Sequence, residues 1–454
     1  MQLPQDFTNQ MLALLSPAEW TELCAALDLP PQVSLRLNGG KKATASSLVT
    51  KHISQDSETA IKAVPWSTSG YYLDKRPNFT LDPLFHTGAY YVQEASSMFV
   101  EQALRMCGSP KLVLDLCAAP GGKSTLLRSL LPDDSLLLCN EPVKTRANVL
   151  AENIIKWGNE GCFVSCNYPK DIARLGPTFD LILVDAPCSG EGMFRKDNPA
   201  VDMWSVDNVA ECAARQRDIV ETIWPTLHDG GYLIYSTCTY NTQENEQNVR
   251  HFCTNLGAQL VEIPTDPQWG ITGSLLKGFD YPVYHFLPHK TRGEGFFLAL
   301  LKKDGTSNPV VANKRTANMS LPREYADKLQ SNEMATIEQG NTLYAVNQAH
   351  AAVVTRLART LYPLHLGIAL CEQKGRKQVP HHSLAMSRLL RTDAYPTADL
   401  TQDEALAYLR HQAIRVSAPR GYVLVCYNGV PLGFVNNLGN RANNLYPAEW
   451  RIRH

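Results

Sequence analysis

The sequence lacks both of the features that direct a chain into a membrane or out of the cell. Its 454 residues contain no apolar run of about 18 residues, the length that a membrane-spanning helix needs. The initial stretch, MQLPQDFTNQM, has neither the basic start nor the apolar centre of a signal peptide. We therefore expect a cytoplasmic protein with no membrane partner.

Cysteine pairs at metal-binding spacing are also missing. The chain has 12 cysteines, but they are scattered, and stretches such as CNEPVK and CFVSC lack the C-x-x-C pairs of a zinc site. Scattered cysteines are typical of reduced thiols in a cytosol. We expect no metal ion.

Net charge is nearly absent from the whole chain but not from its parts. The total is −1, whereas residues 345–454 carry 13 Lys and Arg against 6 Asp and Glu. A basic region of this kind favours a polyanionic partner such as a nucleic acid. The alternative is a solvated basic face that binds nothing.

The length and the local patterns indicate more than one domain. A chain of 454 residues exceeds what one hydrophobic core usually serves. Residues 1 to about 40 predict short helices, one of them capped by Ser16, and then a strand. The polar segment 304–345 predicts a linker or a mobile surface segment. From 346 onward, short strands with Gly and Asn turns predict a small β-rich domain.

Between these regions, apolar strands alternate with helical segments. This alternation predicts an α/β domain whose mainly parallel sheet of seven strands is covered by helices on both faces. The helices are KSTLLRSLL, KTRANVLAENIIKWG and a stretch near 207–228. The strands are expected at 111–116, 135–141, 161–167, 179–185, 230–237, 257–264 and 294–303.

Polar residues stand at the carboxyl ends of five of the expected strands. Ligands of such sheets bind beyond these ends, so the polar residues are expected to line one site. They are Asp115, Glu141, Asn167, Asp185 and the pair Thr237-Cys238.

The first of these ends opens a glycine-rich turn, DLCAAPGGKST (115–125). Gly122-Lys123-Ser124 has the form of the end of a Walker A loop, but such a loop also needs a glycine at position 117, which is Cys117. The stretch FDLILVDAP (179–187) is similar to a Walker B strand that holds magnesium. A P-loop ATPase is therefore one interpretation of this region.

Glu141 points to a different ligand. It lies 20 residues after Gly121, at the end of the second strand, where an acid suits the two hydroxyls of a ribose. A triphosphate would be repelled by this anion, whereas an adenosine would not. The alternative is that Glu141 caps the helix that begins near Pro142.

Two cysteines lie in loops where thiols can act as nucleophiles. Cys188 follows Asp185 by three residues, and Cys238 ends the fifth strand, so the two thiols are expected to converge. A thiolate is a strong nucleophile, and cationic neighbours raise its fraction. Lys123, Arg195 and Lys196 are the candidate cations. A cysteine-dependent acyl or thiol enzyme is an alternative, but none of the 12 His stands at a sheet end to activate Cys238.

Together these stretches resemble a known family. The chain is similar to the Sun/Fmu-type RNA cytosine-5 methyltransferases, the RsmB/RsmF group. The matching motifs lie across roughly 90–303 and are YYVQEASSM, DLCAAPGGKS, NEPVKTRANVLAENIIKWG, LVDAPCSGEGMFRKD, YSTCTYNTQENE and GEGFFLALLKK. The C-terminal region resembles the PUA-like RNA-binding domain of the RsmF branch.

The resemblance implies a Rossmann-like class I methyltransferase that uses S-adenosylmethionine. Its implied catalytic residues are Cys238 as nucleophile, Cys188 as a helper in product release and Asp185 beside the target base. One position departs from the family, since an acid is common near the end of the third strand and this chain has Asn167, with Asp171 as a possible substitute. The implied cofactor-binding residues are Cys117, Ala118, Ala119, Pro120, Gly121, Gly122, Lys123, Glu141, Arg146, Asn167 and Asp185.

The resemblance also implies a mechanism and a domain order. Cys238 adds to carbon 6 of an unpaired or flipped cytosine, which makes carbon 5 reactive toward the methyl group. Small-subunit (16S) ribosomal RNA is the expected substrate, transfer RNA is the alternative, and the chain is expected to be a monomer. A non-catalytic RNA-binding relative is disfavoured by the two cysteines. The expected parts are an N-terminal RNA-binding or substrate region (1–90), the methyltransferase domain (91–303), the linker (304–345) and the PUA-like domain (346–454).

Overall fold

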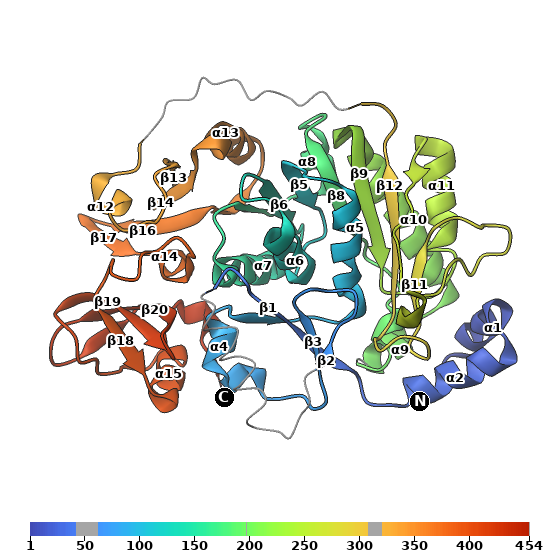
Figure 1. The fold of residues 1–454 in the computed structure, drawn as a ribbon, viewed down its shortest axis with the longest axis horizontal. Helices are drawn as coiled ribbons and strands as arrows, with labels where there is room; N and C mark the ends of the chain where they lie inside the picture. The colour runs from blue at the N-terminus through green and yellow to red at the C-terminus, as the bar shows by residue number, and fades with distance from the viewer. Residues whose placement is uncertain (42–61, 197, 307–319, 454) are drawn as a thin grey trace.

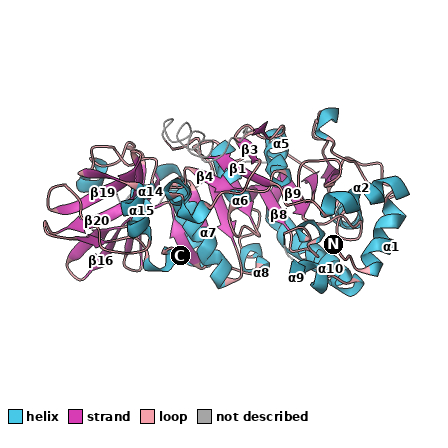
Figure 2. Ribbon diagram, turned by 90° about the horizontal axis from the view of Figure 1, so that it is seen from below, coloured by secondary structure: helices cyan, strands magenta, loops and turns pink. Residues whose placement is uncertain are grey.

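The computed structural model describes residues 1–41, 62–196, 198–306 and 320–453 (Figure 1). Seen from below, the molecule is elongated, with the C-terminal strands at one end, the central sheet in the middle and the first two helices at the other end (Figure 2). These helices are α1 (Gln5–Leu14) and α2 (Pro17–Leu27), and Ser16 caps α2 in a capping box with Glu19.

The central sheet has the strand order β10-β12-β9-β8-β5-β6-β7-β15, with β11 paired to β12. The strands from β7 to β9 in this order are all parallel, as the alternation predicts. Their bounds are β5 Leu112–Asp115, β6 Leu136–Asn140, β7 Cys162–Ser165, β8 Phe179–Asp185 and β9 Leu227–Thr237. The remaining strands are β10 Gln259–Leu260, β11 Tyr284–Phe286, β12 Phe296–Lys302 and β15 Pro363–Leu366.

Helices cover both faces of this sheet because its strands are apolar on both sides. Leu114 of β5 belongs to the core cluster under one set of helices, and its neighbour Val113 belongs to the cluster under the other set. The first set is α8 (Pro169–Ala173), α10 (Val206–Ile223), α11 (Glu246–Leu256) and α13 (Ala351–Thr360). The second set is α5 (Val100–Met106), α6 (Gly122–Leu130) and α7 (Lys144–Trp157).

The sheet has nine strands where the sequence predicts seven. One addition is β15, which comes from the C-terminal region and pairs antiparallel with β7, so the exposed edge of β7 is covered. The other is β11, a three-residue strand too short to stand out in the sequence. Of the strand expected at 257–264, only Gln259 and Leu260 pair with β12.

A four-stranded antiparallel sheet lies on the N-terminal side of the methyltransferase-like domain, in the order β2-β3-β1-β4. Its last strand crosses the expected boundary at 90/91, because Tyr90 and Tyr91 pair with β1. The short helix α4 (Pro83–His86) lies between β3 and β4 in the chain, and α9 (Asn198–Met203) lies between β8 and β9. The strands are β1 Val33–Leu37, β2 Lys62–Ala63, β3 Gly70–Leu73 and β4 Tyr90–Val92.

The C-terminal region holds two further four-stranded sheets, β13-β14-β16-β17 and β18-β19-β20-β21. Its helices are α12 (Arg323–Ala326), α14 (His382–Met386) and α15 (Gln402–Leu409). The strands are β13 Met334–Gln339, β14 Thr342–Asn347, β16 Ile368–Lys374, β17 Lys377–Pro380, β18 Thr397–Leu400, β19 Gly421–Tyr427, β20 Val430–Asn437 and β21 Ala442–Asn444.

The segment expected as a linker is structured in its second half. Residues 307–319 lie outside the described residues. β13 lies within the expected linker and pairs as a hairpin with β14, which runs past the expected end of the linker to Asn347. The hairpin forms because Ala335, Tyr344 and Val346 pack into the core under α13. The overall composition of 304–345 is polar, which masks this alternation in the sequence.

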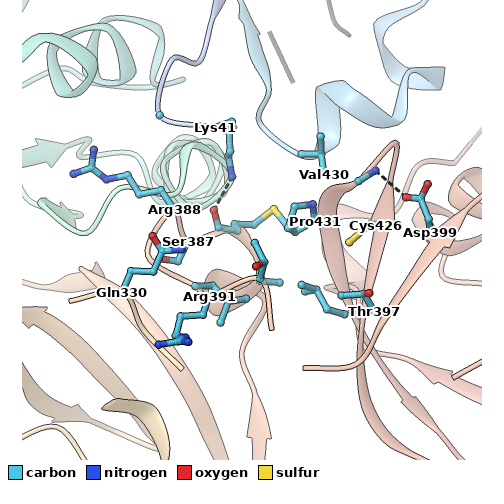
Figure 3. A pocket seen from close by; sticks show the side chains of 17 residues that line it. Lys41, Gln330, Ser387, Arg388, Arg391, Thr397, Asp399, Cys426, Val430 and Pro431 are labelled. Atoms are coloured by element: carbon cyan, nitrogen blue, oxygen red, sulfur yellow. Dashed lines mark hydrogen bonds between the residues drawn. The ribbon is translucent and has the colours of Figure 1, made fainter. Parts of the chain in front are cut away.

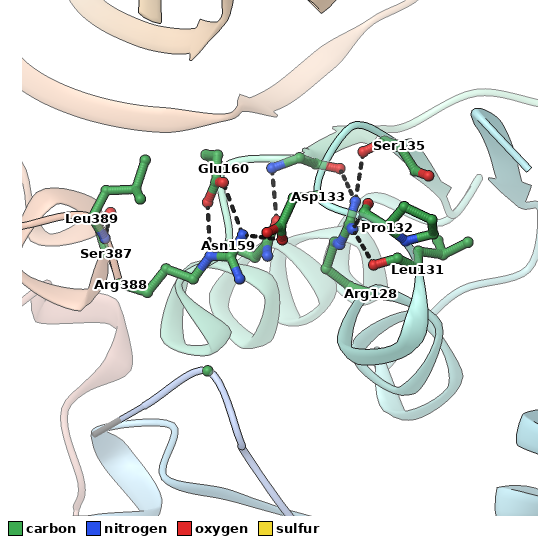
Figure 4. Close-up of polar contacts among 12 residues, drawn as sticks. Arg128, Leu131, Pro132, Asp133, Ser135, Asn159, Glu160, Ser387, Arg388 and Leu389 are labelled. Atoms are coloured by element: carbon green, nitrogen blue, oxygen red, sulfur yellow. Dashed lines mark hydrogen bonds and ion pairs between the residues drawn. The ribbon is translucent and has the colours of Figure 1, made fainter. Parts of the chain in front are cut away.

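Ion pairs and a cavity lie where the C-terminal region meets the rest of the chain. Arg388 binds Glu160 at 2.9 Å and Asp133 at 2.7 Å, beside the carbonyl contacts of Arg128 (Figure 4). Lys41 donates to the Met386 carbonyl at 2.6 Å at the wall of a cavity of about 460 Å³ (Figure 3). Burial lowers the pKa of Lys41 to about 7.

Candidate active site

The polar residues singled out at the strand ends gather at the carboxyl edge of the five parallel strands. Asp115 and Asp185 are the last residues of β5 and β8, and Cys238 directly follows β9. Because adjacent parallel strands end at one edge, these residues from separate motifs form one site.

The glycine-rich turn runs from β5 into α6. Gly121 has a φ of 115° and stands at the N-cap of α6, so the chain turns sharply from the strand into the helix. The turn lines a cavity of about 190 Å³. The other walls come from the N-terminal part of the chain and from β8. The lining residues are Tyr91, Val92, Gln93, Glu94, Ser97, Cys117, Ala118, Ala119, Pro120, Gly122, Lys123 and Asp185.

Lys123 faces a carboxylate rather than open space. Its Nζ donates to Asp185 Oδ2 at 2.8 Å and lies 5.3 Å from the ring centroid of Phe296. Burial opposes the charge of Lys123, but Asp185 outweighs burial and raises the pKa of the amine. The second oxygen of Asp185 accepts a hydrogen bond from Ser236 at 2.8 Å. A lysine neutralised in this way is not available to a triphosphate, which argues against the P-loop ATPase.

Asp115 is a site residue whose role the sequence does not reveal. Its Oδ2 accepts from Ser124 at 2.6 Å, while Oδ1 is buried without a partner among the described residues. Burial raises the pKa of Asp115 to about 7, and Asp185 and Glu141 add to the rise. A buried carboxyl oxygen without a partner is unfavourable, and a cation or hydrogen-bond donor near the end of β5 would satisfy it.

Glu141 is not the N-cap of the helix that follows it. It is buried, it accepts the amide of the N-cap residue Val143 at 3.0 Å, and it pairs with Arg146 at 3.2 Å. Arg146 also donates to the Ala119 carbonyl at 3.2 Å, which links Glu141 to the glycine-rich turn. The ribose role of Glu141 stays a prediction.

The two candidates after β7 have partners away from the cavity. The Asn167 side-chain oxygen accepts the Tyr362 amide at 2.9 Å, and Asp171 accepts the Tyr168 amide at 3.2 Å at the start of α8. Neither residue is among those that line the cavity beside the turn. Their contact with an adenine stays a prediction.

The two thiols converge as expected. Cys188 Sγ and Cys238 Sγ lie 3.0 Å apart, both as free cysteines, and the Cys238 amide donates to Cys188 Sγ at 3.3 Å. The hydrogen bond with Cys238, together with burial, raises the pKa of Cys188 well above its usual range. Cys188 is therefore held as the neutral thiol beside Cys238.

Of the cations proposed for the thiols, the structure supports Lys123. Its charge interacts with Cys238 and with Asp185. Arg195 is neutralised instead by Glu294 at 2.7 Å and is bound to the carbonyls of Ala26 and Gly293. Within the described residues, no His hydrogen-bonds to either thiol, as a cysteine-dependent acyl enzyme would require.

A buried polar network behind the thiols was not identified from the sequence. Glu244 accepts the Ser189 amide at 3.0 Å, and Glu191 accepts the Tyr240 amide at 2.6 Å, so each carboxylate holds one cysteine loop. Asn241 Nδ2 donates to both carboxylates. Burial raises the pKa of Glu244. The network fixes the loop of Cys188 against the loop of Cys238.

Comparisons with known proteins agree with this geometry. Residues 106–302 match the family model of the 16S rRNA methyltransferase RsmB/F, 3–95 that of the N-terminal domain of RsmF, and 395–452 that of the RsmF PUA domain. The chain is 30% identical over 474 residues to the ribosomal RNA small subunit methyltransferase F of Vibrio vulnificus strain YJ016, covering 98% of this chain and 97% of the relative. The chain belongs to the RsmB/F methyltransferase family. The sequence resemblance is thereby confirmed.

Solved structures show the same fold. A methyltransferase homolog from Pyrococcus horikoshii is 25% identical with a TM-score of 0.54, and the match covers 66% of this chain and all (100%) of that one. NSun6 from Pyrococcus horikoshii with SFG, an S-adenosylmethionine analogue, is 20% identical with a TM-score of 0.55, covering 67% of this chain and 99% of that one. This RsmB/F methyltransferase depends on S-adenosylmethionine, as the sequence resemblance implies.

The residues of the cavity fit this cofactor. S-adenosylmethionine carries a sulfonium and an ammonium group. The carboxyl group of Asp185 lines the cavity, and those of Asp115 and Glu141 lie at the neighbouring strand ends, where their charges interact. The unpartnered oxygen of Asp115 is the specific feature that a cationic group would satisfy. In the described part of the chain, no cluster of His, Cys, Asp and Glu could hold a metal ion, and no helix is long and apolar enough to cross a membrane.

Proposed function

We propose that the chain methylates carbon 5 of cytosine in small-subunit (16S) ribosomal RNA through a covalent bond between Cys238 and the base. The observation that supports this most is the pair of thiols 3.0 Å apart beside the Lys123–Asp185 ion pair, at the edge where the cofactor cavity opens. A nucleophile, a second thiol and a carboxylate at one edge are what cytosine-5 chemistry requires.

The first step is the attack of Cys238 on the base. Its thiolate forms a bond to carbon 6, and the electrons of the carbon 5–carbon 6 double bond move toward carbon 5 and the ring. The Lys123 ammonium, hydrogen-bonded to Asp185, supplies a proton that Asp185 passes to ring nitrogen 3, and this proton neutralises the charge that develops there. S-adenosylmethionine supplies an electrophilic methyl group to the activated carbon 5.

Product release requires the reverse of the addition. A base, water in the simplest case, takes the proton from carbon 5, the double bond re-forms, and the carbon 6–sulfur bond breaks. The departing sulfur of Cys238 needs a proton, and the neutral thiol of Cys188 lies within 3.0 Å to donate it. The raised pKa of Cys188 keeps this proton in place until that moment.

The substrate and its setting are part of the same proposal. The curated relative that matches nearly the full length is named a small-subunit ribosomal RNA methyltransferase, and residues 395–452 match a PUA domain. These matches favour 16S ribosomal RNA over transfer RNA. We propose that the enzyme acts in the cytoplasm as a monomer, on RNA that is free or within a ribosomal subunit.

The test is to map the modified base. Purified chain, S-adenosylmethionine and unmodified 16S ribosomal RNA made by transcription should give 5-methylcytosine, detected by bisulfite sequencing. The same mixture with transfer RNA transcripts is the comparison. Methylation of transfer RNA alone would overturn the choice of substrate, and a methyl group on another atom or another base would overturn the reaction.

A further inference from the structure

Two exposed tyrosines lie on neighbouring backbone segments at the β7–β15 end of the sheet edge that holds the candidate active site. Tyr168 is 61% exposed and Tyr362 is 56% exposed. Tyr168 follows β7, and Tyr362 directly precedes β15, the strand that pairs with β7. Large aromatic side chains that are exposed next to each other often mark a binding surface.

Hydrogen bonds fix the backbone around Tyr362, although the side chains of Tyr168 and Tyr362 are exposed. The Cys166 amide donates to the Tyr362 carbonyl at 3.0 Å, and the Tyr362 amide donates to Asn167 Oδ1 at 2.9 Å. Asn167, at the position where the family often has an acid, thus fixes Tyr362 rather than lining the cofactor cavity. The two segments are almost 200 residues apart in the sequence, with a separation of 195 between Asn167 and Tyr362.

Exposed cations belong to the segments that carry the two rings. Lys170 Nζ lies 5.8 Å from the ring centroid of Tyr168, and α13, which ends just before Tyr362, exposes Arg356 and Arg359. Lys170, Arg356 and Arg359 take part in none of the ion pairs among the described residues. Their charge is therefore available to an anion from outside.

Exposed aromatic rings and cations without ion pairs indicate which class of molecule binds this surface. Aromatic faces stack on nucleobases, and Lys and Arg bind phosphates, so this combination suits single-stranded nucleic acid. A membrane surface would need an aliphatic face, and an acidic peptide would not need the rings. The surface formed by Tyr168, Lys170, Arg359 and Tyr362 is called the tyrosine platform below.

The position of the platform matches the path of an RNA substrate. The carboxyl ends of β7 and β9 share one edge of the sheet, and β6, β5 and β8 lie between them. β7 and β9 are separated by four inter-strand spacings of about 4.8 Å each, so the platform lies about 20 Å from Cys238. A single strand with its target cytosine at Cys238 reaches the platform within a few nucleotides.

We propose that the tyrosine platform binds nucleotides of single-stranded RNA that flank the target cytosine, by stacking on Tyr168 and Tyr362 and by phosphate contacts with Lys170 and Arg359. This inference rests on the proposed function, because it takes RNA as the substrate. It assigns a role to the exposed rings, to β15 and to Asn167.

The test measures binding of unmodified 16S ribosomal RNA transcript to the full chain. Tyr168→Ala and Tyr362→Ala should each weaken binding about 5-fold to 100-fold, the usual cost of losing one stacked base, while Tyr168→Phe and Tyr362→Phe should bind like the wild type. Lys170→Ala and Arg359→Ala should each lower the salt dependence of binding by about 0.7 in the log–log slope. Affinity for S-adenosylmethionine should not change.

A matched control is Tyr281→Ala. Tyr281 is 58% exposed, but it precedes β11 at the opposite end of the strand order, so its loss should leave RNA binding unchanged. If Tyr168→Ala and Tyr362→Ala both bind RNA as tightly as the wild type, the platform proposal is wrong. The proposed function is judged separately, by whether the wild type methylates cytosine. A loss of affinity for S-adenosylmethionine instead of RNA would assign the rings to the cofactor and also overturn it. Absence of cytosine methylation by the wild type would count against the proposed function alone.

Discussion

The two ends of the active edge are built in opposite ways. At β8 and β9, the polar groups around the thiols are buried, and Glu191, Glu244 and Asn241 bind one another and the two cysteine loops. At β7 and β15, rings and cations are exposed and have few partners. The difference separates two tasks, because bond formation needs a fixed geometry and contact with a long substrate needs an open surface.

The largest expected effect comes from breaking the buried end. Glu244→Ala leaves the Ser189 amide without its acceptor and removes one of the two acceptors of Gln216 Nε2, so the Cys188 loop can shift against Cys238. A displacement of about 1 Å costs about 100-fold in kcat, whereas the affinity for S-adenosylmethionine should hold. Single-turnover methylation and cofactor titration measure the two quantities.

Two variants serve as controls for Glu244. Glu244→Gln keeps an acceptor for the Ser189 amide and should recover much of the rate. Glu221→Ala removes an exposed glutamate of α10 that pairs with His251, and it should leave the rate unchanged. Equal losses in Glu244→Ala and Glu221→Ala would show that the buried network does not position the thiols.

A smaller effect is expected at the other end, where β15 joins the sheet. Gly367 follows β15 with a φ of 56°, and a Cβ there would lie 2.4 Å from the Ala345 carbonyl oxygen. Gly375, in the β16–β17 turn, has a φ of 63° and open space around it. Gly375→Ala should cost about 1–2 kcal/mol of unfolding free energy for its backbone alone.

Gly367→Ala should cost a further 1–3 kcal/mol, about the penalty of overpacking. Denaturant unfolding of the two variants gives the difference directly. If both variants lose the same stability, the junction between β15 and the C-terminal sheet is looser than the structure indicates.

The last effect depends on pH and concerns Asp115, which lies between the two ends. Burial raises its pKa to about 7 from an ordinary value of 3.8, so the folded chain binds the proton more tightly than the unfolded chain. The stability that this provides is present at low pH and is lost as pH rises through about 7. Unfolding free energies of the cofactor-free wild type, relative to Asp115→Asn, should fall from pH 4 to pH 7. If the unfolding free energies of the wild type and Asp115→Asn change with pH in parallel, Asp115 is not a buried ionisable group.

The sequence predicts the convergence of the two thiols because its signals are local. Cys188 and Asp185 stand three residues apart in one motif, and Cys238 ends an unmistakable apolar strand, so the order of strands is enough to bring them together. The five parallel strands follow from apolar runs for the same reason. The α2 cap at Ser16 is also correct, since a capping box needs only four residues.

The other features of the fold and the site depend on contacts between distant parts of the chain, which a local sequence pattern cannot predict. The pairing of β15 with β7 joins residues almost 200 positions apart, and a polar composition masks β13 and β14. Glu191 and Glu244 look like surface acids until the fold buries them. The sequence gives no sign that the Asn167 side chain accepts the amide of Tyr362, which directly precedes β15. The contact of Asn167 with the cofactor stays a prediction.

The most direct measurement asks which thiol bonds to the base. Cys188→Ala, incubated with S-adenosylmethionine and 16S ribosomal RNA, should still attack carbon 6 through Cys238 and transfer the methyl group, but it should release product about 10²–10⁴-fold more slowly because the proton donor is gone. A covalent protein–RNA band should therefore accumulate on a denaturing gel. Cys238→Ala and the double variant should give no such band. A trapped band in Cys238→Ala, with none in Cys188→Ala, would contradict the assignment and make Cys188 the nucleophile.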